Sequence, residues 1–334
     1  MSSEPIVRVR DLVKTFALGR KWGQRAQTLR AVNGLSFDIG KGETLGLVGE
    51  SGSGKSTTGR MLVGLIPATS GSIRLFGEEI AQPDSKRALA SVRRRLQFVF
   101  QDPQGSLNPR MRIDDAIAEP LDIAGGYSRR DRANRIGELL EMVGLPRSCG
   151  DRFPHEFSGG QRQRIGIARA LALRPDFIVC DEPVSALDVS MQAQIVNLLL
   201  DLQEQLGLSY LFIAHDLAVV RNISSQVAVM YAGAIVEIAP RLQLYSGPKH
   251  PYTQALMAAV PRPVPNRPRA KSVAGELPSL LNPPAGCIFQ PRCTNALDRC
   301  RVEPPVLREV GPGHAAACHL YKADEVEDPL SILR

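Results

Sequence analysis

Two glycines, a lysine and a serine near residue 50 stand at a spacing that suits phosphate binding. Four residues separate Gly49 from Gly54, and Lys55 and Ser56 follow directly. Glycines let the backbone turn so that its N–H groups point at phosphate oxygens, Lys55 can reach the β- and γ-phosphates, and Ser56 can ligate Mg²⁺. A chance glycine-rich turn is the alternative, but this loop follows an apolar run and precedes a predicted helix. The residues predicted to bind ATP are Gly49, Glu50, Ser51, Gly52, Ser53, Gly54, Lys55, Ser56 and Thr57.

Polar residues end three further apolar runs. Asp181 with Glu182, Gln101, and His215 each come directly after such a run. Open α/β sheets bind ligands at the carboxyl ends of their strands. Asp181 is therefore predicted to hold Mg²⁺, directly or through water, and Glu182 to act as the general base that polarises the attacking water. An acidic helix start is the alternative for this pair. Gln101 and His215 are ambiguous alone, since a lone His in such a setting is more often structural.

A second candidate phosphate site begins at Ser158, before Gly159 and Gly160. Ser158 with Gln161 fits a capping box, so a helix start is the simplest interpretation. Ser-Gly-Gly also exposes backbone N–H groups at a helix N-terminus, where anions bind. One nucleotide does not need two such sites from one subunit. A dimer could use both, with the loop of one subunit and the helix start of the other enclosing the γ-phosphate.

The wider pattern predicts an α/β fold. Strands are expected at residues 6–9, 31–39, 44–48, 96–100, 177–180 and 210–214, and a helix at 55–65. Helical periodicity dominates from about 103 to 173, with an apolar face formed by Ile136, Leu139, Leu140 and Val143. Strands that alternate with helices indicate a parallel sheet covered on both faces. Prolines crowd between 261 and 284, so the chain beyond is expected to be a separate extension on a proline-rich linker.

The composition is that of a globular protein, with 334 residues, 43% apolar, 22% charged, and a net charge of +7. The densest basic cluster, at 93–95, suits a solvated helix face or a surface that meets acidic lipids. One Trp and six Tyr provide few stacking platforms for single-stranded nucleic acid. No secretory signal is visible, and no apolar run approaches the roughly 18 to 20 residues that span a bilayer. The chain is expected to be cytosolic, with a partner supplying any membrane part.

In the order in which they follow one another along the chain, these motifs resemble those of the nucleotide-binding subunit of ATP-binding-cassette (ABC) transporters. The loop at 49–57 is similar to the Walker A motif and residues 177–182 to Walker B. Residues 158–161 resemble the family signature, with Phe157 in place of the commoner Leu. Gln101 matches the Q-loop, Asp188 a residue of the D-loop, and His215 the switch histidine. Phe16 has the usual place of the aromatic residue that stacks on adenine, just before an insertion at 19–27.

The resemblance implies an ABC ATPase domain over residues 1–250. It would combine an N-terminal antiparallel β subdomain, a mainly parallel sheet core and a helical subdomain at about 103–173. The resemblance also implies that His215 contacts the γ-phosphate, and that Gln101 helps to bind Mg²⁺ and couples the nucleotide state to a membrane partner. The residues implied to complete an ATP site are Phe16, Ser158, Gly159, Gly160, Gln161 and Asp188.

The C-terminal extension, residues 251–334, resembles the oligopeptide/dipeptide (and nickel) importer branch of the family. The matching segments are 250–256, 275–278 and 282–284, together with a block of four cysteines, Cys287, Cys293, Cys300 and Cys318. Disulfides are not expected in a reducing compartment, and the spacing alone leaves structural zinc and an iron–sulfur cluster open. The resemblance implies a [4Fe–4S] cluster, with Zn²⁺ as the alternative and His314 and His319 as possible substitute ligands.

The importer branch further implies partners and a location. The expected partners are a paralogous ATP-binding subunit or a second copy, two transmembrane permease subunits and, indirectly, an extracytoplasmic solute-binding protein. No nucleic acid is expected, and the chain would lie peripherally on the cytoplasmic face of the bacterial inner membrane. The alternative function is a soluble ABC ATPase that acts on nucleic acid or ribosomes. Such proteins usually fuse two cassettes or carry long coiled coils, and this sequence has neither. A redox- or iron-sensing role for the cysteines is compatible with import.

Overall fold

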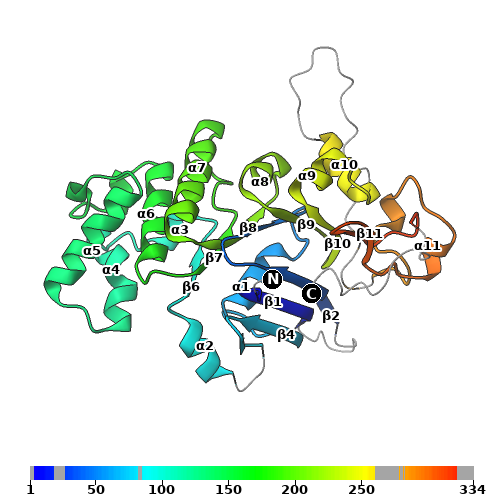
Figure 1. Cartoon of the computed structure of the whole chain (residues 1–334), viewed down its shortest axis with the longest axis horizontal. Helices are drawn as coiled ribbons and strands as arrows, with labels where there is room; N and C mark the ends of the chain where they lie inside the picture. The colour runs from blue at the N-terminus through cyan, green and yellow to red at the C-terminus, as the bar shows by residue number, and fades with distance from the viewer. Residues whose placement is uncertain are drawn as a thin grey trace, which may run out of the picture.

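The structure is a computed structural model that describes residues 4–18, 27–81, 85–259, 278, 281 and 283–321. Its smaller sheet is antiparallel and comes from the N-terminal part of the chain, as expected. In spatial order its strands are β2 (Thr28–Ile39), β1 (Val7–Ala17), β4 (Ser70–Leu75) and β5 (Glu78–Glu79). Figure 1 shows this sheet lying against the centre of the molecule.

The larger sheet has eight strands within the described residues. In spatial order they are β11 (Arg308–Gly311), β12 (His314–Ala316), β10 (Ala234–Pro240), β9 (Gln226–Tyr231), β3 (Thr44–Val48), β8 (Ser209–Ala214), β7 (Phe177–Asp181) and β6 (Leu96–Val99). The five strands from β9 to β6 are parallel to their neighbours, and the three beyond β9 are antiparallel. The predicted α/β class with a mainly parallel core is confirmed.

Both faces of the parallel strands are covered. Helix α1 (Lys55–Leu62) packs between the two sheets, where Leu45 and Leu47 of β3 join the same apolar core. Gly46 points to the other face, where an added Cβ would lie 2.3 Å from Val220 Cγ1 of α8 (Leu217–Ile223). Helix α7 (Val189–Leu206) also covers this second face. Because both faces of these strands are buried, their sequences are continuous apolar runs. These runs allowed the strands to be predicted from the sequence.

The helical part lies at one end of the molecule (Figure 1). Its apolar face of Ile136, Leu139, Leu140 and Val143 is buried, as predicted. The helices from residue 86 to 171 are α2 (Lys86–Val92), α3 (Pro103–Ser106), α4 (Ile113–Ala124), α5 (Arg129–Met142), η1 (Arg147–Cys149), η2 (Pro154–Glu156) and α6 (Gly159–Leu171). No helix in the described stretches combines the length and apolar character that crossing a bilayer requires.

The C-terminal residues are joined to the main sheet. After α9 (Arg241–Ser246) and α10 (Pro251–Ala259), the described chain resumes with η3 (Gln290–Arg292) and α11 (Arg299–Val302). Strand β12 then pairs with β10, with Glu237 opposite Ala316. The extension is therefore continuous with the sheet, unlike the separate unit that was expected, because β10 is a sheet edge that another strand can cover. Most of the proline-rich linker, including 275–277 and Asn282, lies outside the described residues.

Candidate active site

The glycine-rich loop connects β3 to α1, as predicted. An added Cβ at Gly49 would lie 2.1 Å from the Met230 carbonyl oxygen, so the close approach of the loop to β9 requires glycine at this position. At Gly54 the φ angle is 103°, a left-handed conformation that favours glycine. Lys55 is buried at the start of α1, and its Nζ donates to the Gly49 and Glu50 carbonyl oxygens at 2.8 and 3.0 Å. The ammonium is thus held inside the loop.

A hydroxyl and a buried carboxylate meet next to this loop. Ser56 Oγ donates to Asp181 Oδ1 at 2.7 Å, although 125 residues separate them in the sequence. Asp181 ends β7 and is only 1% exposed, and this burial raises the pKa of its carboxyl above the ordinary value. The hydrogen bond from Ser56 opposes the rise. Two adjacent oxygen donors, one of them a desolvated carboxylate, have the chemistry that Mg²⁺ prefers.

The ammonium of Lys55 interacts electrostatically with both acids, Asp181 and Glu182. Burial lowers the pKa of its ammonium below the ordinary value, and the negative charges of Glu182 and Asp181 oppose that change. A desolvated ammonium interacts more strongly with an anion than one in water. The loop therefore offers a fixed positive charge to a polyphosphate.

Glu182 is the centre of a second polar group. Its carboxylate Oε2 accepts a hydrogen bond of 2.8 Å from Gln101 Nε2 and lies 3.7 Å from His215 Nδ1. These three residues follow β6, β7 and β8, so the parallel sheet brings them to one edge. The Glu182 backbone has φ of 46°, a left-handed conformation that costs of order 1 to 2 kcal/mol outside glycine. Such strain is typical of functional positions.

The predicted second phosphate site lies at the start of α6, in the helical part. Ser158 Oγ accepts from the Gln161 N–H at 3.3 Å, and Gln161 Oε1 accepts from the Ser158 N–H at 3.0 Å, so the predicted capping box is present. Phe157, the departure from the family pattern, is buried and fills the apolar position. Within the described residues no hydrogen bond or ion pair joins Ser158 or Gln161 to the glycine-rich loop.

Two further predicted residues lie apart from the acidic group. Asp188 caps α7, where its Oδ1 accepts from the Met191 N–H at 2.9 Å and from Ser190 Oγ at 2.6 Å. Phe16 is half-buried near the end of β1, with Lys14 Nζ 5.0 Å from the centre of its ring. Most of the insertion that follows it, at 19–26, lies outside the described residues.

The four cysteines of the C-terminal block lie close together. Cys287, Cys300 and Cys318 are buried. Burial is the main cause that raises the pKa of the Cys287 thiol to about 11, and the charges of Cys300, Cys318 and Cys293 raise it further. All are free thiols. In the part of the chain that the structure describes, no three Cys, His, Asp or Glu side chains are arranged to hold a metal ion. The expected [4Fe–4S] cluster or Zn²⁺ thus gains no support from the structure.

Two residues that the sequence did not single out contact the loop from the C-terminal part. The Glu50 backbone N–H donates to the Tyr252 hydroxyl at 2.9 Å, and Arg292 forms a two-pronged ion pair with the Glu50 carboxylate. Tyr252 stands in a segment noted only for its resemblance to peptide importers. The position of Arg292 inside the cysteine block was the only signal that could have drawn attention to it.

Comparisons with known proteins agree with this geometry. A family model described as ABC transporter matches residues 32–185, and one described as oligopeptide/dipeptide transporter, C-terminal region, matches residues 236–300. A protein of Brucella abortus (strain 2308) is 63% identical over 318 residues, or 95% of both chains. One of Brucella ovis is 52% identical over 319 residues, covering 95% of this chain and 98% of the relative. Both carry the name of a peptide import ATP-binding protein.

Solved structures give the same result. A dimeric, post-hydrolysis structure of the ATP-binding cassette MJ0796 with ADP and Pi is similar at 29% identity, with a TM-score of 0.62, and the match covers 70% of this chain and 98% of that one. The cbiO1 protein of Clostridium perfringens shares the fold, with a TM-score of 0.63, 23% identity, and coverage of 73% of this chain and 92% of that one. This chain belongs to the family of ABC transporter ATP-binding proteins. It is accordingly an ATPase whose hydrolysis of ATP powers transport.

Proposed function

We propose that this chain drives the import of peptides through a membrane permease at the cytoplasmic face of the bacterial inner membrane. The observation that carries the proposal is the meeting of Gln101, Glu182 and His215 beside the phosphate-binding type of loop. The names of the Brucella relatives and the match to the oligopeptide/dipeptide transporter region support peptides as the cargo. Both favour an importer over an ATPase that acts on nucleic acid or ribosomes.

Each residue of the site has a role in this proposal. The N–H groups of the loop and Lys55 hold the phosphates, and Ser56 and Asp181, with Gln101, hold Mg²⁺. Bound Mg²⁺ would offset the charge of the β- and γ-phosphates. Glu182 takes a proton from the attacking water, and its hydrogen bond from Gln101 fixes the orientation of the carboxylate. His215, beside Glu182, contacts the γ-phosphate.

A second subunit, paralogous or identical, completes the site. Ser158 and Gly159 are exposed at the N-terminus of α6, so their backbone donors are available to an anion from outside the chain. Asp188 is exposed at the N-terminus of α7, where another subunit can reach it. Phe16 stacks on adenine. The dimeric state of the similar MJ0796 cassette supports this arrangement.

The permease docks beside Gln101. A groove of about 1040 Å³ is lined there by side chains that include Phe100, Gln101 and Ile123. Phe100 is 41% exposed and Ile123 is 82% exposed, and exposed apolar residues that line one groove are typical of a protein interaction site. Gln101 therefore faces both Glu182 and the groove, so a movement of the docked segment can change the position of the catalytic carboxylate.

We expect this chain to co-purify with a permease when native membranes are extracted in mild detergent, and peptides to stimulate the ATPase activity of the complex. Ile123→Asp is expected to remove the permease from the complex, because docking would bury a carboxylate at a position that is now apolar. Val302→Asp, at a similarly exposed position in α11 (75%), is the control that retains it. Recovery with ribosomes or DNA and without a permease would refute the proposal.

The cysteine block is proposed to hold a [4Fe–4S] cluster, or otherwise Zn²⁺. Four thiols within 32 residues of the sequence provide enough ligands for such a group, and this number supports the proposal. Protein purified without oxygen is expected to contain iron and sulfide and to absorb in the visible thiolate-to-iron band, and Cys300→Ser to lose both. Stoichiometric zinc without iron would exclude the cluster, and the absence of both metals would exclude a metal site.

A further inference from the structure

Glu50, the second residue of the glycine-rich loop, is held from outside the loop. Arg292 Nη1 donates to its Oε2 at 2.8 Å, and Arg292 Nη2 donates to its Oε1 at 3.0 Å. The Tyr252 hydroxyl accepts from the Glu50 N–H at 2.9 Å. The Glu50 carbonyl is bound by Lys55 Nζ. The Ser53 N–H also donates to this carbonyl, at 3.2 Å. The partners of the carbonyl thus come from the loop and α1, whereas those of the Glu50 side chain and N–H come from the C-terminal part of the chain.

Arg292 is fixed in place by its own surroundings. Its side chain is 5% exposed, against 25% for that of Glu50, and its guanidinium lies over the Tyr231 ring, 5.7 Å from the centre. Arg292 ends η3, whose preceding residue, Phe289, packs edge-on against Tyr231. The hydrogen bonds that Arg292 donates to Glu50 raise the pKa of Arg292 above the ordinary value, so the guanidinium stays charged. This is a planar, buried and oriented ion pair, of the kind that arginine forms and lysine does not.

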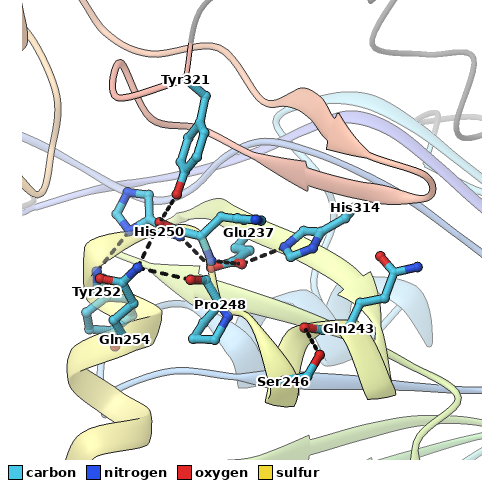
Figure 2. Close-up of polar contacts among 10 residues, drawn as sticks. Glu237, Gln243, Ser246, Pro248, His250, Tyr252, Gln254, His314 and Tyr321 are labelled. Carbon is cyan, nitrogen blue, oxygen red and sulfur yellow. Dashed lines mark hydrogen bonds and ion pairs between the residues drawn. The ribbon is translucent and has the colours of Figure 1, made fainter.

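Tyr252 is fixed by a buried carboxylate in β10. Figure 2 shows Glu237 at the centre of this group. It accepts from the N–H groups of Lys249 and His250 at 2.6 and 2.9 Å, and its Oε1 lies 2.7 Å from His314 Nε2. His250 Nδ1 in turn accepts from the Tyr252 N–H at 3.1 Å, and burial lowers the pKa of His250 to about 4, which keeps the ring neutral. Strands β10 and β12 together thus set the position of Tyr252.

We propose that Arg292, with Tyr252, is a positioning residue of the ATP site and acts on the phosphate loop through Glu50. This inference rests on the proposed role of the loop in holding phosphates. Arg292 neutralises a carboxylate that would otherwise repel the polyphosphate, and it fixes the loop at its first turn. The C-terminal part of the chain, including the cysteine block in which Arg292 stands, thereby sets the affinity for ATP.

The pairing of Arg292 with Glu50 predicts that loss of Arg292 changes KM for ATP and leaves kcat nearly unchanged. Without Arg292, Glu50 remains a partly buried, unpaired anion beside the phosphates, and ATP binding becomes weaker. Glu182 and Asp181 do not contact Arg292, so the chemical step is unaffected. Arg292→Gln is therefore expected to raise KM for ATP about 5- to 30-fold and to leave kcat close to that of the wild type. Arg292→Lys keeps the positive charge but cannot form the bidentate ion pair, so it is expected to retain part of the affinity for ATP.

The test measures KM and kcat of the assembled transporter for Arg292→Gln in two backgrounds, wild type and Glu50→Gln. Glu50→Gln removes the repulsive charge, so Arg292→Gln is expected to have little further effect in that background. An equal rise of KM in both backgrounds would show a general loss of folding instead of positioning through Glu50, and would overturn the proposal. A fall of kcat without a change of KM would overturn it as well.

Two controls separate this inference from the function on which it rests. Arg299→Gln, in the same C-terminal part, removes an ion pair with Glu303 that does not reach the loop, and KM is expected to be unchanged. Lys55→Ala is expected to lose ATP binding. If Lys55→Ala binds ATP normally, the proposed phosphate site itself is wrong. If Lys55→Ala loses ATP while Arg292→Gln keeps the wild-type KM, only the role of Arg292 is wrong.

Discussion

Glu182→Gln is expected to slow ATP hydrolysis by about 10²- to 10⁴-fold while ATP still binds. The amide cannot take the proton of the attacking water, but it can keep a hydrogen bond with Gln101. Lys55 and Ser56 do not depend on the Glu182 side chain for their positions, because their partners are loop carbonyls and Asp181. The variant should therefore bind ATP and remain in the ATP-bound dimer, since hydrolysis is the step that releases the subunits.

This outcome is measured as steady-state phosphate release, ATP affinity by calorimetry, and the mass of the protein in ATP by light scattering. Glu204→Gln, an exposed carboxylate on α7, is the matched control and should behave as the wild type. Wild-type turnover by Glu182→Gln would disprove the role of general base. Loss of ATP binding would instead assign Glu182 to the structure of the site.

Ser158→Arg is expected to slow ATP hydrolysis by roughly 10²- to 10³-fold or more. The binding of ATP to the glycine-rich loop of the variant itself is expected to be unchanged. The bulky cation blocks the helix start that contacts the γ-phosphate of the other subunit, and the loss of such donors has effects of this size. Ser158 is exposed and has no contact with the loop of its own chain, so the binding of ATP there should be unchanged.

The matched control for this variant lies in the same helical part. Ser128 caps α5 in the same way, since its Oγ accepts from the Asp131 N–H at 3.2 Å, and it is equally exposed. Ser128→Arg loses a helix cap, at about 1 kcal/mol of stability, and should retain ATPase activity. Comparable loss of activity in both variants would mean that helix stability, and not contact with the nucleotide, explains the effect of Ser158→Arg.

The parts of the site that follow buried strands could be predicted from the sequence. Each strand is an apolar run with a polar residue directly after it, and parallel pairing brings the strand ends to one edge. Asp181 and Glu182 were predicted in this way, whereas the roles of Gln101 and His215 came only from the resemblance to the ABC family. The start of α6 could also be predicted, because the capping box of Ser158 and Gln161 is a local sequence pattern.

The contacts made by the C-terminal part could not be predicted in the same way. Arg292 and Glu50 are 242 residues apart, and no periodicity in either segment records the pairing. The antiparallel strands β9 and β10 were not recognised either, and the pairing of β12 with β10 depends on which sheet edge is free, a property of the whole fold. The prolines before residue 284 suggested a separate unit, whereas the sheet continues into it.

The claim that two subunits share each ATP site is tested most directly by combining two inactive variants. Lys55→Ala lacks a working loop but keeps the α6 start, and Ser158→Arg lacks the α6 start but keeps the loop. In a complex in which this chain occupies both cassette positions, a dimer of one variant with the other contains one whole site. Mixing the two proteins is therefore expected to restore ATP hydrolysis that neither shows alone. If the mixture stays as inactive as its components, the shared site is contradicted.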